Sequence, residues 1–168
     1  MKERFADMRN LFQRKKALQA VCNGEVCPLS EIPDEAFSSG MLGQGYAIRP
    51  ENGRFLCPAN GRVASIAEAK HAYTILTSDG LDLLVHLGVD TVTLGGEGFT
   101  PKVAEGDTVQ AGAPLAEVDL SLLEQRGIPT ITAVLLTNAD HLTNIECRMG
   151  RARGGQDTVF TFRIGGKG

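Results

Sequence analysis

From residue 21 onward, short apolar segments alternate with clusters of turn-forming residues, and no long amphipathic stretch interrupts them. Many of the apolar residues are β-branched, which suits a pleated sheet. Several of the turn clusters lie about 8–12 residues apart, a spacing typical of antiparallel sandwiches and barrels. The pattern therefore predicts an all-β domain. The turn clusters are Asn23-Gly24, Gly43–Gly45, Asn52-Gly53, Asn60-Gly61, Ser78–Gly80, Gly95-Gly96, Glu105–Asp107 and Gly154-Gly155.

Two short helical turns are expected within this β pattern. One lies near Pro33–Ser38. The other follows Ser121, because Ser121 and Glu124 have the spacing of a capping box and Gly127 supplies a stop. Both are too short to change the predicted fold class.

Residues 1–20 differ from the rest of the chain in charge, with six basic and two acidic side chains. Basic amphipathic helices bind anionic membrane surfaces or grooves of partner proteins, whereas a locally packed helix is the plainer interpretation. We therefore expect a basic amphipathic segment over residues 1–20, open to peripheral membrane contact, and one domain over residues 21–168. The apolar residues near one face of this segment are Phe5, Met8, Leu11, Phe12 and Leu18.

The composition argues against several classes of protein. The net charge of −3 does not suit a sequence-independent nucleic-acid binder, which needs a basic surface. No run of about 18 apolar residues is present and no signal segment opens the chain, so we expect a cytoplasmic protein. The cysteines form no C-x-x-C pair and are expected to be free thiols, in neither a disulfide nor a zinc site. They are Cys22, Cys27, Cys57 and Cys147.

Residues 103–115 carry a turn pattern in which Gly106 and Gly112 alternate with apolar positions. The pattern resembles the turn of biotinyl and lipoyl carrier domains and their barrel-sandwich relatives. Physically it describes a tight turn with inward-facing apolar side chains. The nearest candidate for a modified lysine, Lys70, follows Ala69 and lacks flanking methionines. The pattern therefore favours a barrel-sandwich fold, and we expect no cofactor.

Two of the three histidines, His71 and His86, bracket a predicted β-hairpin with its turn at Ser78–Gly80. A two-residue turn would pair them directly or diagonally, and the period of two along a strand would then put both on one face, together with Tyr73 and Leu84. A three-residue loop would put the histidines on opposite faces. With the two-residue turn, the core face would hold Ala72, Leu76, Leu83, Val85 and Leu87.

Two facing imidazoles support three kinds of chemistry, and the residues alone leave all three open. Imidazole is the commonest metal ligand, although a zinc site here would need carboxylates as further ligands. Alternatively, one ring acts as a nucleophile while the other donates a hydrogen bond to the developing charge. The histidines can also be purely structural. The apolar patch around them, edged by acidic residues, suits a surface for docking another protein.

The stretch from Gly80 to Val92, followed by Gly96–Phe99, resembles the active-site signature of the glucose-type IIA proteins (EIIA) of the bacterial phosphoenolpyruvate-dependent sugar phosphotransferase system. The similarity extends over residues 22–165 or so. Further segments in the expected order are Pro33-Asp34 with Phe37, Gly43–Pro50, Pro58–Gly61, the turn at Val103–Leu115, and Asp119–Glu124.

The resemblance implies an antiparallel β-sandwich of the duplicated-hybrid kind and a phosphotransferase role without a metal. The phosphocarrier protein HPr would donate a phosphoryl group to His86, which would pass it to a cysteine on the IIB domain of a sugar permease, with His71 hydrogen-bonding the phosphoryl group. Asp34 and Asp90 would flank the site and meet basic residues of partners. The apolar docking surface would comprise Phe37, Met41, Leu42 and Leu84.

The chain departs from the family pattern at one position near the histidines. Family members usually carry a threonine two residues before the first histidine, where this chain has Ala69. The missing hydroxyl favours, as an alternative, a regulatory protein-binding module with weak or lost phosphoryl transfer, whose regulatory partners would use the same surface. A zinc hydrolase of related architecture would use an H-x-H pair, which the three histidines do not form. His141 is interpreted as a surface residue.

Overall fold

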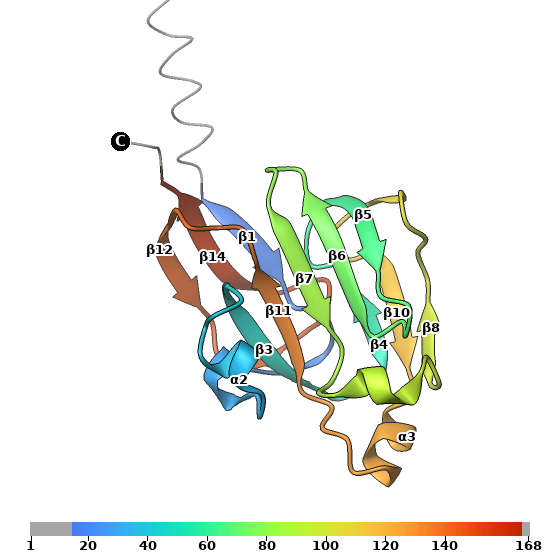
Figure 1. Cartoon of the computed structure of the whole chain (residues 1–168). Helices are drawn as coiled ribbons and strands as arrows, with labels where there is room; N and C mark the ends of the chain where they lie inside the picture. The colour runs from blue at the N-terminus through green and yellow to red at the C-terminus, as the bar shows by residue number, and fades with distance from the viewer. Residues whose placement is uncertain (1–14, 166–168) are drawn as a thin grey trace, which may run out of the picture.

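The computed structural model describes residues 15–165, in which strands predominate and helices are confined to short turns (Figure 1). The strands are β1 (Lys16–Gln19), β2 (Gly24–Cys27), β3 (Gln44–Pro50), β4 (Arg54–Leu56), β5 (Gly61–Ile66), β6 (Ala72–Thr77), β7 (Asp82–His86), β8 (Phe99–Pro101), β9 (Thr108–Val109), β10 (Pro114–Val118), β11 (Thr132–Leu136), β12 (Leu142–Cys147), β13 (Gly150–Ala152) and β14 (Thr158–Ile164). The helical elements are η1 (Leu29–Glu31), α2 (Glu35–Ser38), η2 (Thr91–Leu94) and α3 (Leu120–Gln125).

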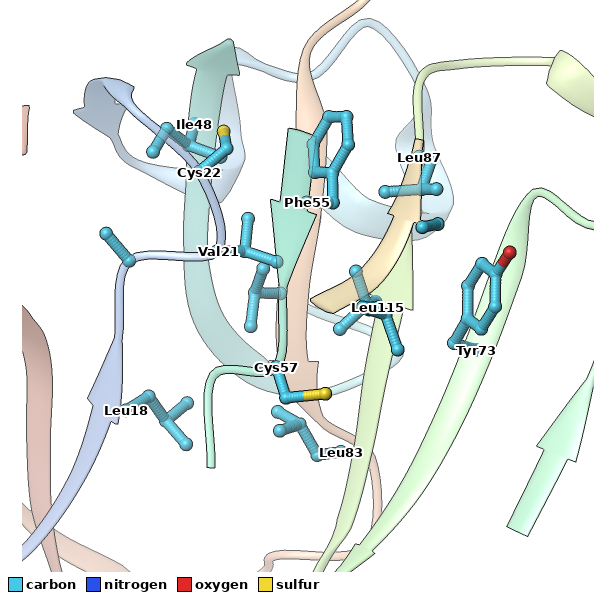
Figure 2. Close-up of a cluster of buried hydrophobic side chains, with 14 of the residues drawn as sticks. Leu18, Val21, Cys22, Ile48, Phe55, Cys57, Tyr73, Leu83, Leu87 and Leu115 are labelled. Atoms are coloured by element: carbon cyan, nitrogen blue, oxygen red, sulfur yellow. The ribbon is translucent and has the colours of Figure 1, made fainter. Parts of the chain in front are cut away.

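Three antiparallel sheets build the domain. The largest has eight strands in the order β13-β2-β3-β11-β7-β6-β5-β9, and the two smaller ones have the orders β1-β14-β12 and β4-β10-β8. Side chains from all three sheets meet in the main core, where Leu18, Phe55 and Tyr73 are almost fully buried (Figure 2). The prediction of an all-β antiparallel sandwich is confirmed.

The β6–β7 hairpin has a three-residue loop, Ser78–Gly80, and the expected two-residue turn is wrong. The Thr77 amide donates to the Leu81 carbonyl at 2.8 Å, and Ala72 pairs with His86. This register moves Tyr73 into the core, and it moves Ala72 and Leu76 to the outer face with Leu84 and His86. Both faces of the hairpin carry apolar residues, so burial alone does not penalise a slip of one residue.

The short helices lie close to their expected positions. The α2 helix begins after Asp34, whose carboxylate accepts a hydrogen bond from the Ala36 amide at 3.0 Å. The α3 helix is capped by Asp119, which accepts from the Leu122 amide at 3.2 Å, so the capping box expected at Ser121 is wrong. Aspartate is as good an N-cap as serine, and Asp119 precedes Ser121 in the chain, so the helix begins two residues earlier than expected.

The chain is part of the domain from β1 onward. Residues 16–19 pair with β14, and Leu18 is 2 % exposed in the core, so its expected place on a helical face is wrong. The remainder of the proposed amphipathic helix, residues 1–14, lies outside the described residues and stays a prediction. The four cysteines are free thiols, as expected.

Candidate functional site

The rings of His71 and His86 lie together at one end of the β6–β7 hairpin. Their centroids are 5.0 Å apart and the ring planes meet at 84°, an edge-to-face arrangement. His86 is the last residue of β7, and His71 immediately precedes β6. In Figure 1 this end of the hairpin leads into η2 at the bottom of the view, whereas β1 begins at the top. The histidine pair is thus far from the point where the described chain begins.

His71 reaches His86 from a position outside the strands. Ala72 pairs with His86, and the Leu87 amide donates to the His71 carbonyl at 2.8 Å, so regular alternation would direct His71 into the core. His71 instead lies just outside β6 and directly follows Lys70, whose φ of 64° is left-handed. The two rings meet, although the three-residue loop of the hairpin would by itself put them on opposite faces.

The imidazole of His86 is oriented by the loop that follows it. Its Nδ1 lies 2.8 Å from the carbonyl oxygen of Gly88. A carbonyl oxygen only accepts, so Nδ1 carries the proton and Nε2 keeps its lone pair. Gly88 has a φ of 76°, and a Cβ there would approach Thr91 Cγ2 at 2.6 Å and the Pro129 carbonyl oxygen at 3.0 Å. Only glycine fits, so this backbone position fixes which nitrogen of His86 is free.

Burial keeps both imidazoles neutral at pH 7. It lowers the pKa of His86 from the ordinary value of 6.5, and the hydrogen bond to Gly88 and the charges of Asp34 and Asp90 oppose the shift without cancelling it. Burial also lowers the pKa of His71, and His86 adds to that effect. A neutral imidazole has a nucleophilic lone pair without needing a separate base.

The two acidic residues flank the pair from different elements. Asp34 is the N-cap of α2, and Asp90 precedes η2 in a left-handed conformation with a φ of 59°. Behind His86, the ring of Phe37 lies 5.0 Å from the imidazole at 55°. Phe37 is only 5 % exposed, so it mainly packs against the imidazole and offers little surface to a partner.

Several apolar side chains are exposed or half-buried on β7, on η2 and in the segment that follows α2. Met41 is 81 % exposed and Leu42 37 %, and Leu84 is half-buried on the outer face of β7. The structure adds Val92, which is 58 % exposed on η2 and was not selected from the sequence. The sequence signal that could identify Val92 is its apolar side chain within a turn, outside any predicted strand that would bury it.

A shallow pocket of about 360 Å³ lies beside His71, lined by Ala67, Glu68, Ala69, His71, Val92 and Gly95. The Nδ1 atom of His71 is buried and has no hydrogen-bond partner within the described chain. The question raised by the missing hydroxyl at Ala69 is thereby answered for residues 15–165, since no other side chain takes its place. The Nδ1 atom of His71 is therefore not anchored by a hydrogen bond within these residues.

The remaining candidate chemistry lies elsewhere or is not supported. His141 is exposed and is not part of the pair. In the part of the chain that the structure describes, no group of three or more His, Cys, Asp or Glu side chains is arranged to hold a metal ion. Among residues 15–165, no helix has the length and apolar content needed to cross a membrane.

Comparison with known proteins identifies the family of this chain. The family model for the phosphoenolpyruvate-dependent sugar phosphotransferase system, EIIA 1, matches residues 16–142. The glucose-specific EIIA component of Oceanobacillus iheyensis is 35% identical over 144 residues, which cover 82% of this chain and 87% of that protein. The glucoside-specific EIICBA component of Staphylococcus carnosus is 43% identical over 129 residues, 77% of this chain but 18% of that longer protein.

A solved structure supports the same assignment. Glucose permease IIA from Mycoplasma capricolum matches with a TM-score of 0.82 and 32% sequence identity, over 89% of this chain and 97% of that one. The family resemblance carried by the histidine hairpin is confirmed, and this chain belongs to the EIIA 1 family of the phosphoenolpyruvate-dependent sugar phosphotransferase system.

Proposed function

We propose that His86 accepts a phosphoryl group from phospho-HPr and passes it to a cysteine of a IIB domain, with His71 assisting the transfer. Membership of the family supports a phosphocarrier role. The single observation that carries the residue assignment is the hydrogen bond from His86 Nδ1 to the Gly88 carbonyl, which leaves Nε2 as a fixed lone-pair nitrogen beside a second imidazole.

In the first step, the Nε2 lone pair of His86 attacks phosphorus in line with the leaving group. The bond from phosphorus to the donor atom of HPr breaks, and that donor keeps the electron pair. The His86 ring becomes cationic while Nδ1–H stays bonded to the Gly88 carbonyl. The charges of Asp34 and Asp90, which already favour protonated His86, stabilise this cation. Such a transfer depends mainly on positioning and charge stabilisation.

The second imidazole acts on the phosphoryl group. With ring centroids 5.0 Å apart, a neutral His71 is close enough for an N–H to donate to a phosphoryl oxygen carried on His86 Nε2. This hydrogen bond holds the phosphoryl group in line for the onward step and stabilises the charge that its oxygens carry. A IIB thiolate then attacks phosphorus, the Nε2–phosphorus bond breaks, and the electron pair returns to Nε2.

A shallow site suits this exchange because two different proteins must reach the same phosphorus atom. The proposed docking surface combines the carboxylates of Asp34 and Asp90 with the exposed Met41 and Leu42 and the half-buried Leu84. A basic rim on HPr and on IIB would complement the carboxylates and speed the encounter. Phosphorylation adds nearly two negative charges to this surface, which changes its affinity for any partner.

The test uses the purified full chain with phosphoenolpyruvate, enzyme I and HPr. We expect an acid-labile, base-stable phosphate on the wild type, as a phosphohistidine requires, and none on His86→Ala. The matched control is His141→Ala, which removes an exposed histidine outside the pair. Label that persists in His86→Ala would disprove the nucleophile assignment.

One observation favours the second candidate function, a regulatory binding module with weak transfer. His71 lacks a hydrogen-bond partner at Nδ1 where Ala69 replaces the usual hydroxyl, so its orientation is less constrained. If compatible partners fail to phosphorylate the wild type while HPr still binds it, this alternative replaces the carrier role.

A further inference from the structure

The residue that directly precedes His71 has an unusual backbone conformation. Lys70 has a φ of 64°, and the other described non-glycine residues with positive φ are Asp90 and Asn144. Asp and Asn tolerate the left-handed region because their short polar side chains form local hydrogen bonds, whereas lysine has no such compensation. Strained residues of this kind persist where surrounding structure enforces them, often at functional sites.

Two backbone hydrogen bonds enforce the conformation of Lys70. Its amide donates to the Ala67 carbonyl at 2.8 Å, and the Ala67 amide donates to the Ala72 carbonyl at 2.9 Å. Together they close the turn between β5 and β6. The side-chain stem of Lys70 lies near Gly96, where an added Cβ would be 3.7 Å from Lys70 Cδ. The turn that carries Lys70 thus lies against the segment that follows η2.

We propose that the left-handed backbone of Lys70 is the device that aims His71 at His86, which makes Lys70 a positioning residue for phosphoryl transfer. In the observed register, regular alternation assigns His71 to the core side of the hairpin, yet its ring meets His86 of the outer face at 5.0 Å. The left-handed turn lies immediately before His71 and interrupts that alternation. The role in transfer rests on the proposed function, whereas the positioning does not.

Matched substitutions separate the backbone effect from the charge of the lysine. Lys70→Asn and Lys70→Val both remove the ammonium group. Asparagine readily adopts positive φ, but for a β-branched valine this region is a genuine outlier. We therefore expect Lys70→Asn to behave like the wild type and Lys70→Val to displace His71.

The first readout needs no phosphorylation. In the full chain, the imidazole NMR signals and the ring-to-ring nuclear Overhauser effect of His71 and His86 are compared between the variants. We expect wild-type signals in Lys70→Asn. In Lys70→Val we expect loss of the ring-to-ring effect, and the pKa of His71 should return toward that of a solvated histidine.

The second readout is the rate of each transfer step. Displacing the assisting ring should slow transfer from His86 to IIB by about 10–100-fold in Lys70→Val, because small misplacements at a reacting centre have effects of that order. Acceptance from phospho-HPr, which depends on His86, should change much less.

The outcomes distinguish the positioning from the proposed function. Wild-type spectra in Lys70→Val, or equal displacement in Lys70→Asn and Lys70→Val, would overturn the positioning role. Absence of phosphorylation in the wild type would refute the carrier function, and the spectra would still decide the positioning. If Lys70→Val does not fold, Lys70→Ala takes its place, because alanine also disfavours positive φ.

Discussion

The imidazole rings of His71 and His86 lie 5.0 Å apart and nearly perpendicular, although the register of their hairpin assigns the two positions to opposite faces. The two rings also differ in how they are held. His86 is anchored through Nδ1 to the Gly88 carbonyl, whereas the Nδ1 of His71 is buried without a partner. One ring is therefore held by a backbone hydrogen bond, and the other depends on packing and on the turn before it.

Replacing the assisting histidine should separate the two transfer steps. His71→Gln leaves the Nε2 nucleophile of His86 intact, so phosphorylation by phospho-HPr should proceed. Onward transfer to IIB should slow by about 100-fold, the usual cost of losing one donor to developing charge. Single-turnover transfer from the labelled protein measures this. Equal loss in both steps would show that His71 positions His86 instead of acting on the phosphoryl group.

Gly88→Ala should damage the site through the backbone. The added Cβ would approach Thr91 Cγ2 at 2.6 Å and the Pro129 carbonyl oxygen at 3.0 Å, at a φ of 76°. We expect a loss of about 1–3 kcal/mol in the free energy of unfolding together with slower phosphorylation of His86. Denaturant titration and phosphorylation rates test both effects.

Gly80→Ala is the matched control for that variant. Gly80 also has a left-handed φ, 82°, but a Cβ there meets nothing within 4 Å. Gly80→Ala should therefore lose only about 1 kcal/mol in the free energy of unfolding, the cost of placing alanine at positive φ. Its phosphorylation should stay normal. If the two variants are equally impaired in phosphorylation, the close packing around Gly88 has no role in holding His86.

The histidine pair should make stability depend on pH. Burial lowers the pKa of both rings below 6.5, so between 6.5 and the lowered pKa the unfolded chain binds more protons than the folded one. The free energy of unfolding should thus be level above pH 6.5 and fall as the pH drops below it. Comparing denaturant unfolding of the wild type with that of His71→Gln/His86→Gln isolates this contribution. Parallel curves through that range would contradict it.

Supplying a hydroxyl at position 69 should anchor His71. Ala69 and His71 line the same pocket, and the Nδ1 atom of His71 has no partner. A hydrogen bond from Ala69→Thr to Nδ1 should raise the free energy of unfolding by about 1 kcal/mol relative to Ala69→Val, which has the same shape without the hydroxyl. Identical unfolding curves for the two variants would mean that the hydroxyl does not reach the ring.

Local features of the chain were predictable from the residues themselves. The alternation of apolar segments and turns, the glycine turn at Gly106 and Gly112, and the helix after Asp34 depend on neighbours close in sequence. The family could be identified because the stretch around His86 is continuous along the chain. Within the candidate site, the two histidines and their flanking acidic residues were selected on this basis.

What only the tertiary structure decided depends on contacts between distant segments. Leu18 belongs to a strand because it pairs with Phe160 of β14, a residue from the far end of the chain. The register of the β6–β7 hairpin differs by one residue from the expected one. Both faces of the hairpin are apolar, so the sequence pattern favours neither register, and packing against the core decides between them. The meeting of His71 with His86 follows from a left-handed lysine, which no propensity favours and which hydrogen bonds across the folded turn enforce.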